Sequence, residues 1–224
     1  MIMGDTIQLQ SADGFTLSAY VATPEGTPRG AIVVVQEIFG VNAHIRSVAD
    51  RFATEGYVAI APALYDRITP NFEVGYSLDD MGKGRAVVEK IDRDKALADI
   101  QAAIDHVKGQ GKVGIVGYCW GGTMAWLSAA KLDGLSAAIG YYGSGVLSLS
   151  DLKPRCPTIL HFGDLDKHIP VESVREFAAK RPDVPTYIYA ADHGFNCDAR
   201  GSFNQAAADL ARGRTLDFFA KHIA

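Results

Sequence analysis

Uniformly apolar stretches alternate with segments of helical periodicity along most of this chain. The apolar stretches are residues 31–35, 57–61, 113–116, 137–141 and 158–161, with a weaker one at 186–189. A strand that is buried on both faces has such a continuous apolar pattern. The helical segments are residues 43–55, 93–108, 122–131, 171–180 and 203–221. Strands that alternate with helices predict an α/β fold: a mostly parallel sheet with helices on both faces.

The N-terminal segment has a different pattern. Residues 6–10 and 15–21 alternate between apolar and polar positions on either side of Asp13-Gly14. Alternation around such a turn signal is typical of antiparallel strands with one solvated face. We therefore expect the sheet to begin with an antiparallel hairpin at its edge.

Residues 66–90 fit neither pattern. The segment is rich in glycine and charge, and it is longer than an ordinary connection. A lid that faces the substrate and a solvated loop explain it equally well. No linker, repeat or low-complexity tract divides the chain, so we expect residues 1–224 to form a single domain.

Composition and charge limit the classes of molecule that we expect this protein to bind. With 224 residues, of which 48 % are hydrophobic, the chain is long enough to bury a substantial core. The net charge is −4 and no long block of Lys and Arg occurs, so nothing indicates binding to nucleic acid or to an anionic membrane. The N-terminus lacks the basic start and apolar core of a signal peptide. We expect a cytoplasmic monomer or weak homodimer that acts on a small molecule.

The chain has three cysteines, Cys119, Cys156 and Cys197. Their odd number and wide spacing argue against a disulfide framework and against a zinc site. Cys156 and Cys197 lack flanking glycines, so we interpret them as structural or incidental. We expect no bound metal.

Cys119 occupies a distinctive local sequence. It is the middle residue of Gly117-Tyr118-Cys119-Trp120-Gly121, between an apolar stretch and a helical segment. The pattern G-x-nucleophile-x-G at a strand-to-helix junction is the nucleophile elbow of α/β-hydrolases, usually built around serine. A cysteine at a strand end is more often a small buried apolar residue. The flanking glycines favour a nucleophile instead, because a Cβ in their place would crowd a strained turn.

A thiol nucleophile needs a base, and the base needs an orienting acid. In α/β-hydrolases the acid and then the histidine follow the nucleophile in the chain. His193 lies on the loop after the last predicted strand. Asp164 and Asp166 both follow the strand at 158–161 and qualify equally by position, although Asp164 could instead cap a turn. His161 falls within that apolar strand, where we expect it to be buried.

The loop after the strand at 31–35 carries a second functional element. In this fold it supplies one N–H of the oxyanion hole, and the residue after the nucleophile supplies the other. The expected donors are Ile38 and Trp120. Glu37 beside the thiol would keep the thiol protonated until substrate arrives. An ion pair between Glu37 and Arg46 is an equally good interpretation of the same residue.

Several motifs occur together in order: Gln36-Glu37-Ile38-Phe39-Gly40, Gly117-Tyr118-Cys119-Trp120-Gly121-Gly122, Gly140-Tyr141-Tyr142-Gly143, Gly163-Asp164-Leu165-Asp166-Lys167-His168-Ile169-Pro170 and His193-Gly194-Phe195. With them the sequence resembles the dienelactone hydrolase (carboxymethylenebutenolidase) family over nearly its whole length. The resemblance implies an α/β-hydrolase fold that needs no cofactor.

The resemblance also implies residue roles. Cys119 corresponds to the nucleophile, His193 to the base, and Asp166 to the orienting acid, since the family aspartate stands four residues before the proline that is Pro170 here. An acidic residue matching Glu37 pairs with the resting thiol in this family and swings away when substrate binds. Ile38 and Trp120 match the oxyanion donors. From the same motifs we expect Phe39, Tyr142 and Phe195 to contact the substrate.

One departure from the family concerns the substrate. Members that act on dienelactone have arginines that grip the substrate carboxylate, one of them four residues after the catalytic histidine. Here that position is Cys197. A second arginine falls within residues 66–90, where Arg67 and Arg85 are the candidates. We therefore expect a lactone or ester substrate, but not a preference for dienelactone itself.

The sequence thus predicts a carboxylic ester or lactone hydrolase with a Cys-His-Asp triad. Two other classes stay open. A glutamine-amidotransferase-like or redox cysteine enzyme also places a thiol at a strand-to-helix turn, although the His-x-Glu pair typical of such amidotransferases is absent downstream. A binding protein without catalytic activity could also retain this fold.

Overall fold

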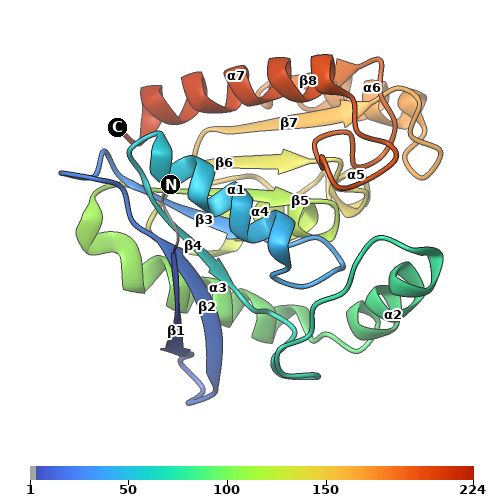
Figure 1. The fold of residues 1–224 in the computed structure, drawn as a ribbon. Coiled ribbons are helices and arrows are strands. Elements are labelled where there is room, and N and C mark those ends of the chain that lie inside the picture. Colours follow the sequence, from blue (N-terminus) through green and yellow to red (C-terminus); the bar gives the residue numbers. More distant parts are fainter. Residues whose placement is uncertain (1–3) are drawn as a thin grey trace.

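The computed structural model describes residues 4–224 as one eight-stranded sheet with helices on both faces (Figure 1). The strand order is β1-β2-β4-β3-β5-β6-β7-β8. The strands are β1 (Asp5–Gln10), β2 (Thr16–Ala22), β3 (Ala31–Val35), β4 (Val58–Pro62), β5 (Val113–Tyr118), β6 (Leu135–Tyr141), β7 (Thr158–Gly163) and β8 (Thr186–Tyr189). Strand β2 pairs antiparallel with β1 and β4, and the remaining pairs are parallel. The predicted parallel sheet with an antiparallel hairpin at its edge is confirmed.

The helices are α1 (Ala43–Thr54), α2 (Leu78–Val88), α3 (Arg93–Val107), α4 (Trp120–Lys131), α5 (Gly145–Ser148), α6 (Val171–Lys180) and α7 (Gln205–His222). The predicted helical segments correspond to α1, α3, α4, α6 and α7, with ends that differ by at most two residues. None of the helices in residues 4–224 has the length and apolar character needed to cross a membrane.

The two faces of the sheet pack against different helices. Ile32 and Val34 of β3 belong to a core cluster with residues of α1 and α7, whereas Val33 belongs to a second cluster with residues of α3. Successive residues of a strand point to opposite faces, so an all-apolar strand supplies both clusters at once. This double burial explains why the parallel strands could be recognised in the sequence.

The irregular segment at 66–90 contains a helix that the sequence did not predict. In α2 only Gly84 and Val87 are buried, so the helix has almost no apolar periodicity. Ser77 and Asp80 start it with a reciprocal capping box. A Cβ on Gly84 would lie 2.3 Å from the carbonyl oxygen of Ile38. The segment is therefore packed against the loop after β3 and is more than a solvated loop.

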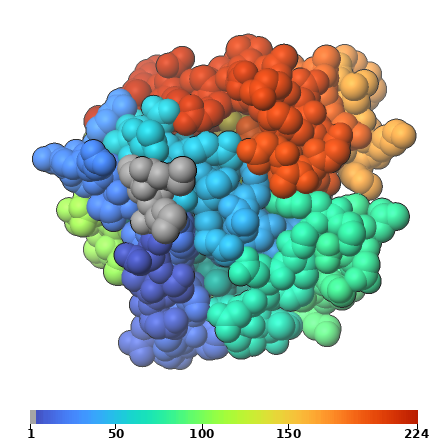
Figure 2. Space-filling view, in the orientation of Figure 1, coloured from blue at the N-terminus to red at the C-terminus, as the bar shows by residue number. Residues whose placement is uncertain are grey.

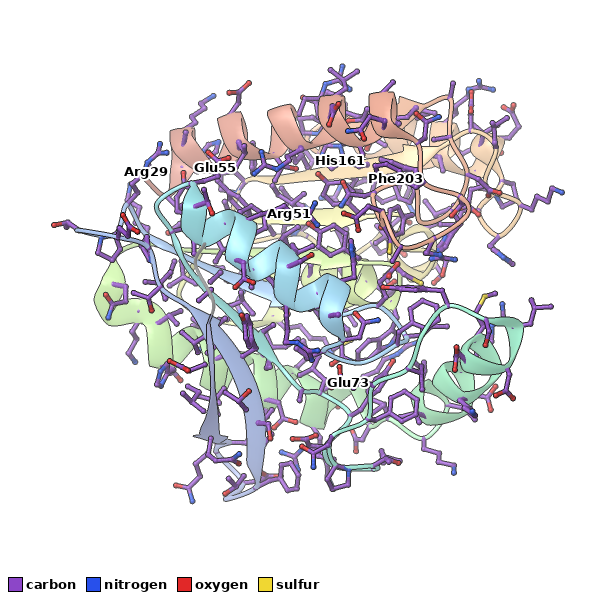
Figure 3. All side chains as sticks on the ribbon, in the orientation of Figure 1. Arg29, Arg51, Glu55, Glu73, His161 and Phe203 are labelled. Atoms are coloured by element: carbon purple, nitrogen blue, oxygen red, sulfur yellow. The ribbon has the colours of Figure 1, made fainter. Side chains whose placement is uncertain are left out.

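His161 lies in β7 between the sheet and α7, and its side chain is fully buried, as predicted (Figure 3). Its Nδ1 is 2.7 Å from the Tyr189 hydroxyl and its Nε2 is 3.3 Å from Oγ1 of Thr215 in α7. Burial disfavours the charged imidazolium and lowers the pKa of His161 to about 3. The folded protein therefore holds this imidazole neutral.

We predict that His161 makes the fold sensitive to acid. An unfolded histidine has a pKa of about 6.5, so between about pH 6.5 and pH 3 the unfolded chain binds a proton that folded His161 does not. The stabilisation is present above this window and is lost as the pH falls through it, by up to about 1.4 kcal/mol per pH unit. His161→Gln, which keeps hydrogen-bonding groups at this position, should flatten the slope of unfolding free energy against pH, measured by denaturant titration.

The matched control is His106→Gln on the exposed side of α3, which should leave the slope as it is in the unmodified protein. If the slope is the same in His161→Gln and in the unmodified protein, His161 is not the buried neutral group described above.

Candidate active site

Cys119 forms the turn between β5 and α4. Its backbone has φ 55° and ψ −119°, outside the regions that a non-glycine residue usually adopts. Such a conformation costs of order 1–3 kcal/mol and persists only where the surrounding structure enforces it. The side chain is partly exposed. The turn therefore holds the thiol at the carboxyl end of the sheet, next to the first turn of α4.

Close backbone contacts enforce this turn. A Cβ on Gly117 would lie 1.9 Å from the carbonyl oxygen of Gly121. A Cβ on Gly121 would lie 2.4 Å from the carbonyl oxygen of Gln36, which follows β3. Both distances are shorter than any side-chain carbon tolerates, so the glycines that flank Cys119 are needed for space.

Three loops at this edge of the sheet bring Cys119, His193 and Asp166 together. Nε2 of His193 is 3.2 Å from Sγ of Cys119, and Nδ1 of His193 is 2.6 Å from Oδ2 of Asp166. Oδ1 of Asp166 accepts the backbone N–H groups of His168 and Ile169, which fixes the carboxylate. The three side chains thus form one hydrogen-bonded chain from carboxylate to sulfur.

The neighbouring Asp164 takes a different position. Its side chain is exposed and its backbone N–H donates to the carbonyl of Tyr189. Asp166, in contrast, is buried at the His193 ring. Of the two aspartates that the sequence left equivalent by position, Asp166 is therefore the one that contacts His193.

The surroundings of His193 favour its charged form. Burial lowers its pKa, but the hydrogen bonds to Asp166 and Cys119 outweigh burial and raise the pKa to about 10. For Asp166, burial raises the pKa, and the hydrogen bond and positive charge of His193 bring it below its usual value.

Glu37 is buried beside this chain of side chains, with 1 % of its surface exposed. Its Oε1 is 3.3 Å from Nη1 of Arg200. The alternative prediction, an ion pair between Glu37 and Arg46, is wrong, because Arg46 pairs with Glu73 instead, at 2.7 Å. Within residues 4–224, no hydrogen bond joins Glu37 to Cys119. In this structure Glu37 is therefore the counter-ion of an arginine.

Sequence reasoning missed Arg200. Its guanidinium lies 5.6 Å from the centre of the Phe39 ring, and a Cβ on Gly194 would lie 2.4 Å from its Nη1. Burial lowers the pKa of Arg200, but the neighbouring groups, with the Glu37 carboxylate first among them, together outweigh burial and raise it. The motif His193-Gly194-Phe195 therefore leaves room for this side chain. No motif pointed to it, because it comes from a loop that has no periodic pattern.

The two expected oxyanion donors lie on the segments that follow β3 and β5. Trp120 is the first residue of α4 and Ile38 lies on the loop after β3. Within the described part of the chain, neither backbone N–H has a hydrogen-bond acceptor. The positive end of the α4 dipole adds to the potential at this point. Both amides are therefore free to bind a developing negative charge.

The three aromatic residues expected to contact substrate are buried. Phe39, Tyr142 and Phe195 have 1 %, 0 % and 0 % of their surfaces exposed. The Tyr142 ring packs 5.0 Å from His193 and 5.4 Å from Phe195, and the Phe39 ring packs 4.6 Å from Tyr76. In this structure the Tyr142 ring packs against His193 and the Phe39 ring lies under the Arg200 guanidinium, and contact of these rings with a substrate stays a prediction.

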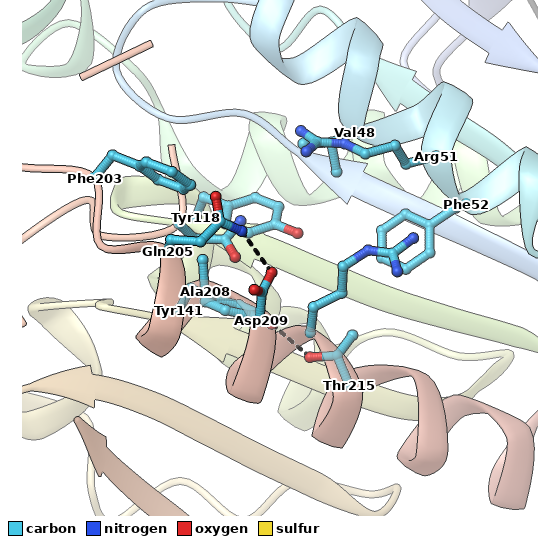
Figure 4. Close-up of a pocket in the computed structure, with 12 residues that line it drawn as sticks. Val48, Arg51, Phe52, Tyr118, Tyr141, Phe203, Gln205, Ala208, Asp209 and Thr215 are labelled. Atoms are coloured by element: carbon cyan, nitrogen blue, oxygen red, sulfur yellow. Dashed lines mark hydrogen bonds between the residues drawn. The ribbon is translucent and has the colours of Figure 1, made fainter. Parts of the chain in front are cut away.

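A separate cavity lies between α1 and α7 (Figure 4). Arg51 and Phe52 of α1 line it on one side, and Gln205 and Asp209 of α7 line it on the other. Its wall includes Tyr118 but none of the three hydrogen-bonded side chains described above. The cavity therefore does not open onto the thiol.

Comparison with known proteins shows the family to which this chain belongs. The model of the dienelactone hydrolase family matches residues 17–223. A carboxymethylenebutenolidase of Pseudomonas putida is 35 % identical over 234 aligned positions, which cover 98 % of this chain and 97 % of the relative. This chain belongs to the dienelactone hydrolase family. It is a hydrolase of that type, as the sequence motifs predict.

Solved structures of the dienelactone hydrolase family have the same fold. A presumed dienelactone hydrolase of Klebsiella pneumoniae superposes with a TM-score of 0.87 at 30 % identity, covering 99 % of this chain and 100 % of that one. A dienelactone hydrolase of Anabaena variabilis has a TM-score of 0.75 at 16 % identity, covering 100 % and 99 %, and supports the fold alone. The predicted α/β-hydrolase fold is confirmed.

The two arginines that we expected to hold a substrate carboxylate in this dienelactone hydrolase family member lie elsewhere. Arg67 donates to Asp99 and Asp13 over distances of 2.8–2.9 Å, so its guanidinium is already occupied. Arg85 is exposed on α2. The expectation for Arg67 is wrong for this reason, and the arginine that contacts Glu37 is Arg200.

We predict that Gly121→Ala destabilises the protein by at least about 2 kcal/mol, because its Cβ would collide with backbone that cannot move aside. Gly213→Ala in α7 is the matched control. A Cβ there meets nothing within 4 Å, and alanine should stabilise the helix by about 0.5–1 kcal/mol. Thermal and denaturant unfolding measure both changes. Equal stability of the two variants would contradict the close packing of the turn.

Proposed function

We propose that this protein hydrolyses carboxylic esters or lactones through an acyl-enzyme on Cys119. The observation that carries the proposal is the distance of 3.2 Å between Sγ of Cys119 and Nε2 of His193, on a strained turn flanked by glycines. The name of the Pseudomonas putida relative denotes a lactone-opening enzyme, which agrees with this substrate class.

In the first step the thiolate of Cys119 attacks the carbonyl carbon of the substrate. The electron pair of the C=O bond moves to the oxygen, where the amides of Ile38 and Trp120 donate to the new negative charge. The tetrahedral intermediate collapses when its C–O bond breaks, and the leaving oxygen takes the proton from the His193 imidazolium. In a lactone the leaving alcohol stays attached to the acyl group.

In the second step water releases the acyl group. The neutral His193 removes a proton from water, the resulting hydroxide attacks the thioester carbon, and the C–S bond breaks to restore the thiolate. Asp166 keeps Nδ1 of His193 protonated, so that Nε2 faces the reacting atoms. No further group is needed for the atoms and charges to balance.

Arg200 sets the charge preference in this proposal. It can bind a substrate carboxylate only in competition with the buried carboxylate of Glu37, which it already contacts. An anionic ester would therefore replace Glu37 at the guanidinium, and a neutral ester would leave the ion pair intact. The choice between the two substrate classes rests on this one arginine.

We predict that Cys119→Ala lowers the turnover of a chromogenic ester by at least about a thousandfold, because alanine fills the space without supplying a nucleophile. Cys156→Ala is the matched control and should retain the activity of the unmodified protein, since Cys156 lies outside the hydrogen-bonded chain. Circular dichroism and thermal unfolding check that both variants fold. A Cys119→Ala variant that keeps more than a small fraction of the turnover would contradict the assignment of Cys119 as the nucleophile.

We predict that Arg200→Gln lowers kcat/KM for carboxylate-bearing esters about 10–100-fold more than for neutral esters of equal size. A charge-assisted hydrogen bond in a partly dehydrated site contributes enough binding free energy to change kcat/KM by this factor. The ratio of the two kcat/KM values cancels any general loss caused by leaving Glu37 unpaired. Arg85→Gln on the exposed side of α2 is the control and should not change the ratio. An unchanged ratio in Arg200→Gln would exclude Arg200 as the anchor.

A further inference from the structure

Glu37, His44 and Cys197 form a second cluster of chemically reactive side chains. They come from the loop after β3, the first turn of α1 and the loop before α7. A carboxylate oxygen, a ring nitrogen and the sulfur lie within 4.8 Å of one another. All three residues are buried, with 1 %, 5 % and 0 % of their surfaces exposed. We define them as the Glu37 cluster.

Two polar atoms of the Glu37 cluster lack a partner. Within residues 4–224, neither Oε2 of Glu37 nor Nε2 of His44 has a hydrogen-bond partner, and both atoms are buried. Each unsatisfied buried polar atom costs about 1–3 kcal/mol. Because the other oxygen of Glu37 contacts Arg200, only Oε2 is left for a further ligand.

The partner of His44 directs its free nitrogen toward metal binding. Nδ1 of His44 is 3.0 Å from Oδ1 of Asp198, and Arg51 lies 3.5 Å from the other oxygen of Asp198. A carboxylate on one ring nitrogen places the proton there and leaves the lone pair of the other nitrogen free. Metal-binding histidines in proteins have this arrangement.

The three donor types select a borderline-soft divalent cation. Imidazole nitrogen, thiolate sulfur and carboxylate oxygen are the ligands of Zn²⁺, whereas Mg²⁺ and Ca²⁺ require oxygen alone. The charges of Glu37 and a Cys197 thiolate would cancel those of Zn²⁺, and Arg51 balances Asp198. Zn–N and Zn–S bonds of about 2.1 and 2.3 Å need only a small inward movement of the three atoms.

A hollow at the surface leads to the Glu37 cluster. Asn42, His44, Tyr76 and Ala199 are among the residues that line it. The segments that form it, at the start of α1, before α2 and before α7, adjoin one another in blue, green and orange-red in the space-filling view (Figure 2). His44 is the member of the Glu37 cluster that lines this hollow.

We propose that the Glu37 cluster binds one Zn²⁺ and that its occupancy inhibits the hydrolase. When the Zn–S bond forms, the thiol proton of Cys197 leaves to solvent. Bound Zn²⁺ fixes the position of Glu37 and of the loop that carries the Ile38 amide. Glu37 then stays paired with Arg200, and the guanidinium is not available to the substrate. The inhibition rests on the proposed function, whereas the binding does not.

Metal binding is tested in Cys119→Ala, because Cys119, His193 and Asp166 also offer sulfur, nitrogen and oxygen. Titration with Zn²⁺ in a calorimeter, and with Co²⁺ by its thiolate charge-transfer absorption, should show one bound ion. Cys119→Ala/Cys197→Ala should lose the absorption, and Cys119→Ala/Cys156→Ala should keep it. Asp198→Asn in the same background should weaken binding by about 10–100-fold.

Thermal unfolding provides a second readout that does not depend on catalysis. Zn²⁺ should raise the Tm of Cys119→Ala but not that of Cys119→Ala/Cys197→Ala, since a ligand stabilises only the fold that binds it. Cooperative unfolding without metal shows that both variants are folded. If Cys119→Ala binds no metal, or if the Co²⁺ absorption survives Cys197→Ala, the metal site is overturned.

Inhibition is measured in proteins that retain Cys119, each relative to its own rate without metal. Cys197→Ala should raise the half-inhibiting Zn²⁺ concentration by at least about tenfold, whereas Cys156→Ala should leave it unchanged. Zn²⁺ binding in Cys119→Ala combined with equal inhibition of the unmodified protein and Cys197→Ala would overturn the inhibitory role. Because binding is measured without turnover, failure of the metal site and failure of the proposed hydrolase are distinguishable.

Discussion

The close contact between the first turn of α4 and the ends of the neighbouring strands is the constraint on which the site depends. A Cβ on Gly121 would lie 2.5 Å from the carbonyl oxygen of Val35, and one on Gly122 would lie 2.6 Å from that of Tyr141. The packing therefore fixes the ends of β3 and β6 relative to Cys119. It also holds Cys119 in a backbone conformation that an isolated turn would avoid. The loops that begin at these strand ends carry the remaining site residues.

Charge is distributed unequally on the two sides of the thiol. On one side Asp166 and His193 supply a proton donor whose charged form is favoured. On the other side Glu37, which is buried, forms an ion pair with the partly buried Arg200. A buried ion pair gains little stability over apolar residues, because desolvation offsets the attraction. The substrate and metal binding that we propose would give this ion pair a role other than stability.

Much of the fold could be predicted because it is periodic. The parallel strands are buried on both faces and alternate with amphipathic helices, so hydrophobicity alone located them. The helix α2 could not be found this way, since it buries only Gly84 and Val87. Cys119 could be identified as the candidate nucleophile because the tight turn that holds it requires glycines at neighbouring positions in the sequence. The resemblance to the dienelactone hydrolase family separated Asp166 from Asp164.

The residues that could not be predicted reach the site through tertiary packing. Arg200 and His44 lie in segments whose local sequence gives no sign of an active site, and only the approach of the α1 and α7 loops brings them to Glu37. Cys197 was interpreted as structural or incidental because no glycines flank it. The motif residues Tyr142 and Phe195 are buried and pack against His193 and each other, a position that the motifs alone did not reveal.

The acyl-enzyme on Cys119 is tested most directly by rapid quenching during ester turnover, followed by peptide mass spectrometry. We expect the acyl group of the ester to be attached to the peptide that contains Cys119 and to no other. Steady turnover without that adduct, or an adduct on another residue, would contradict an acyl-enzyme on Cys119.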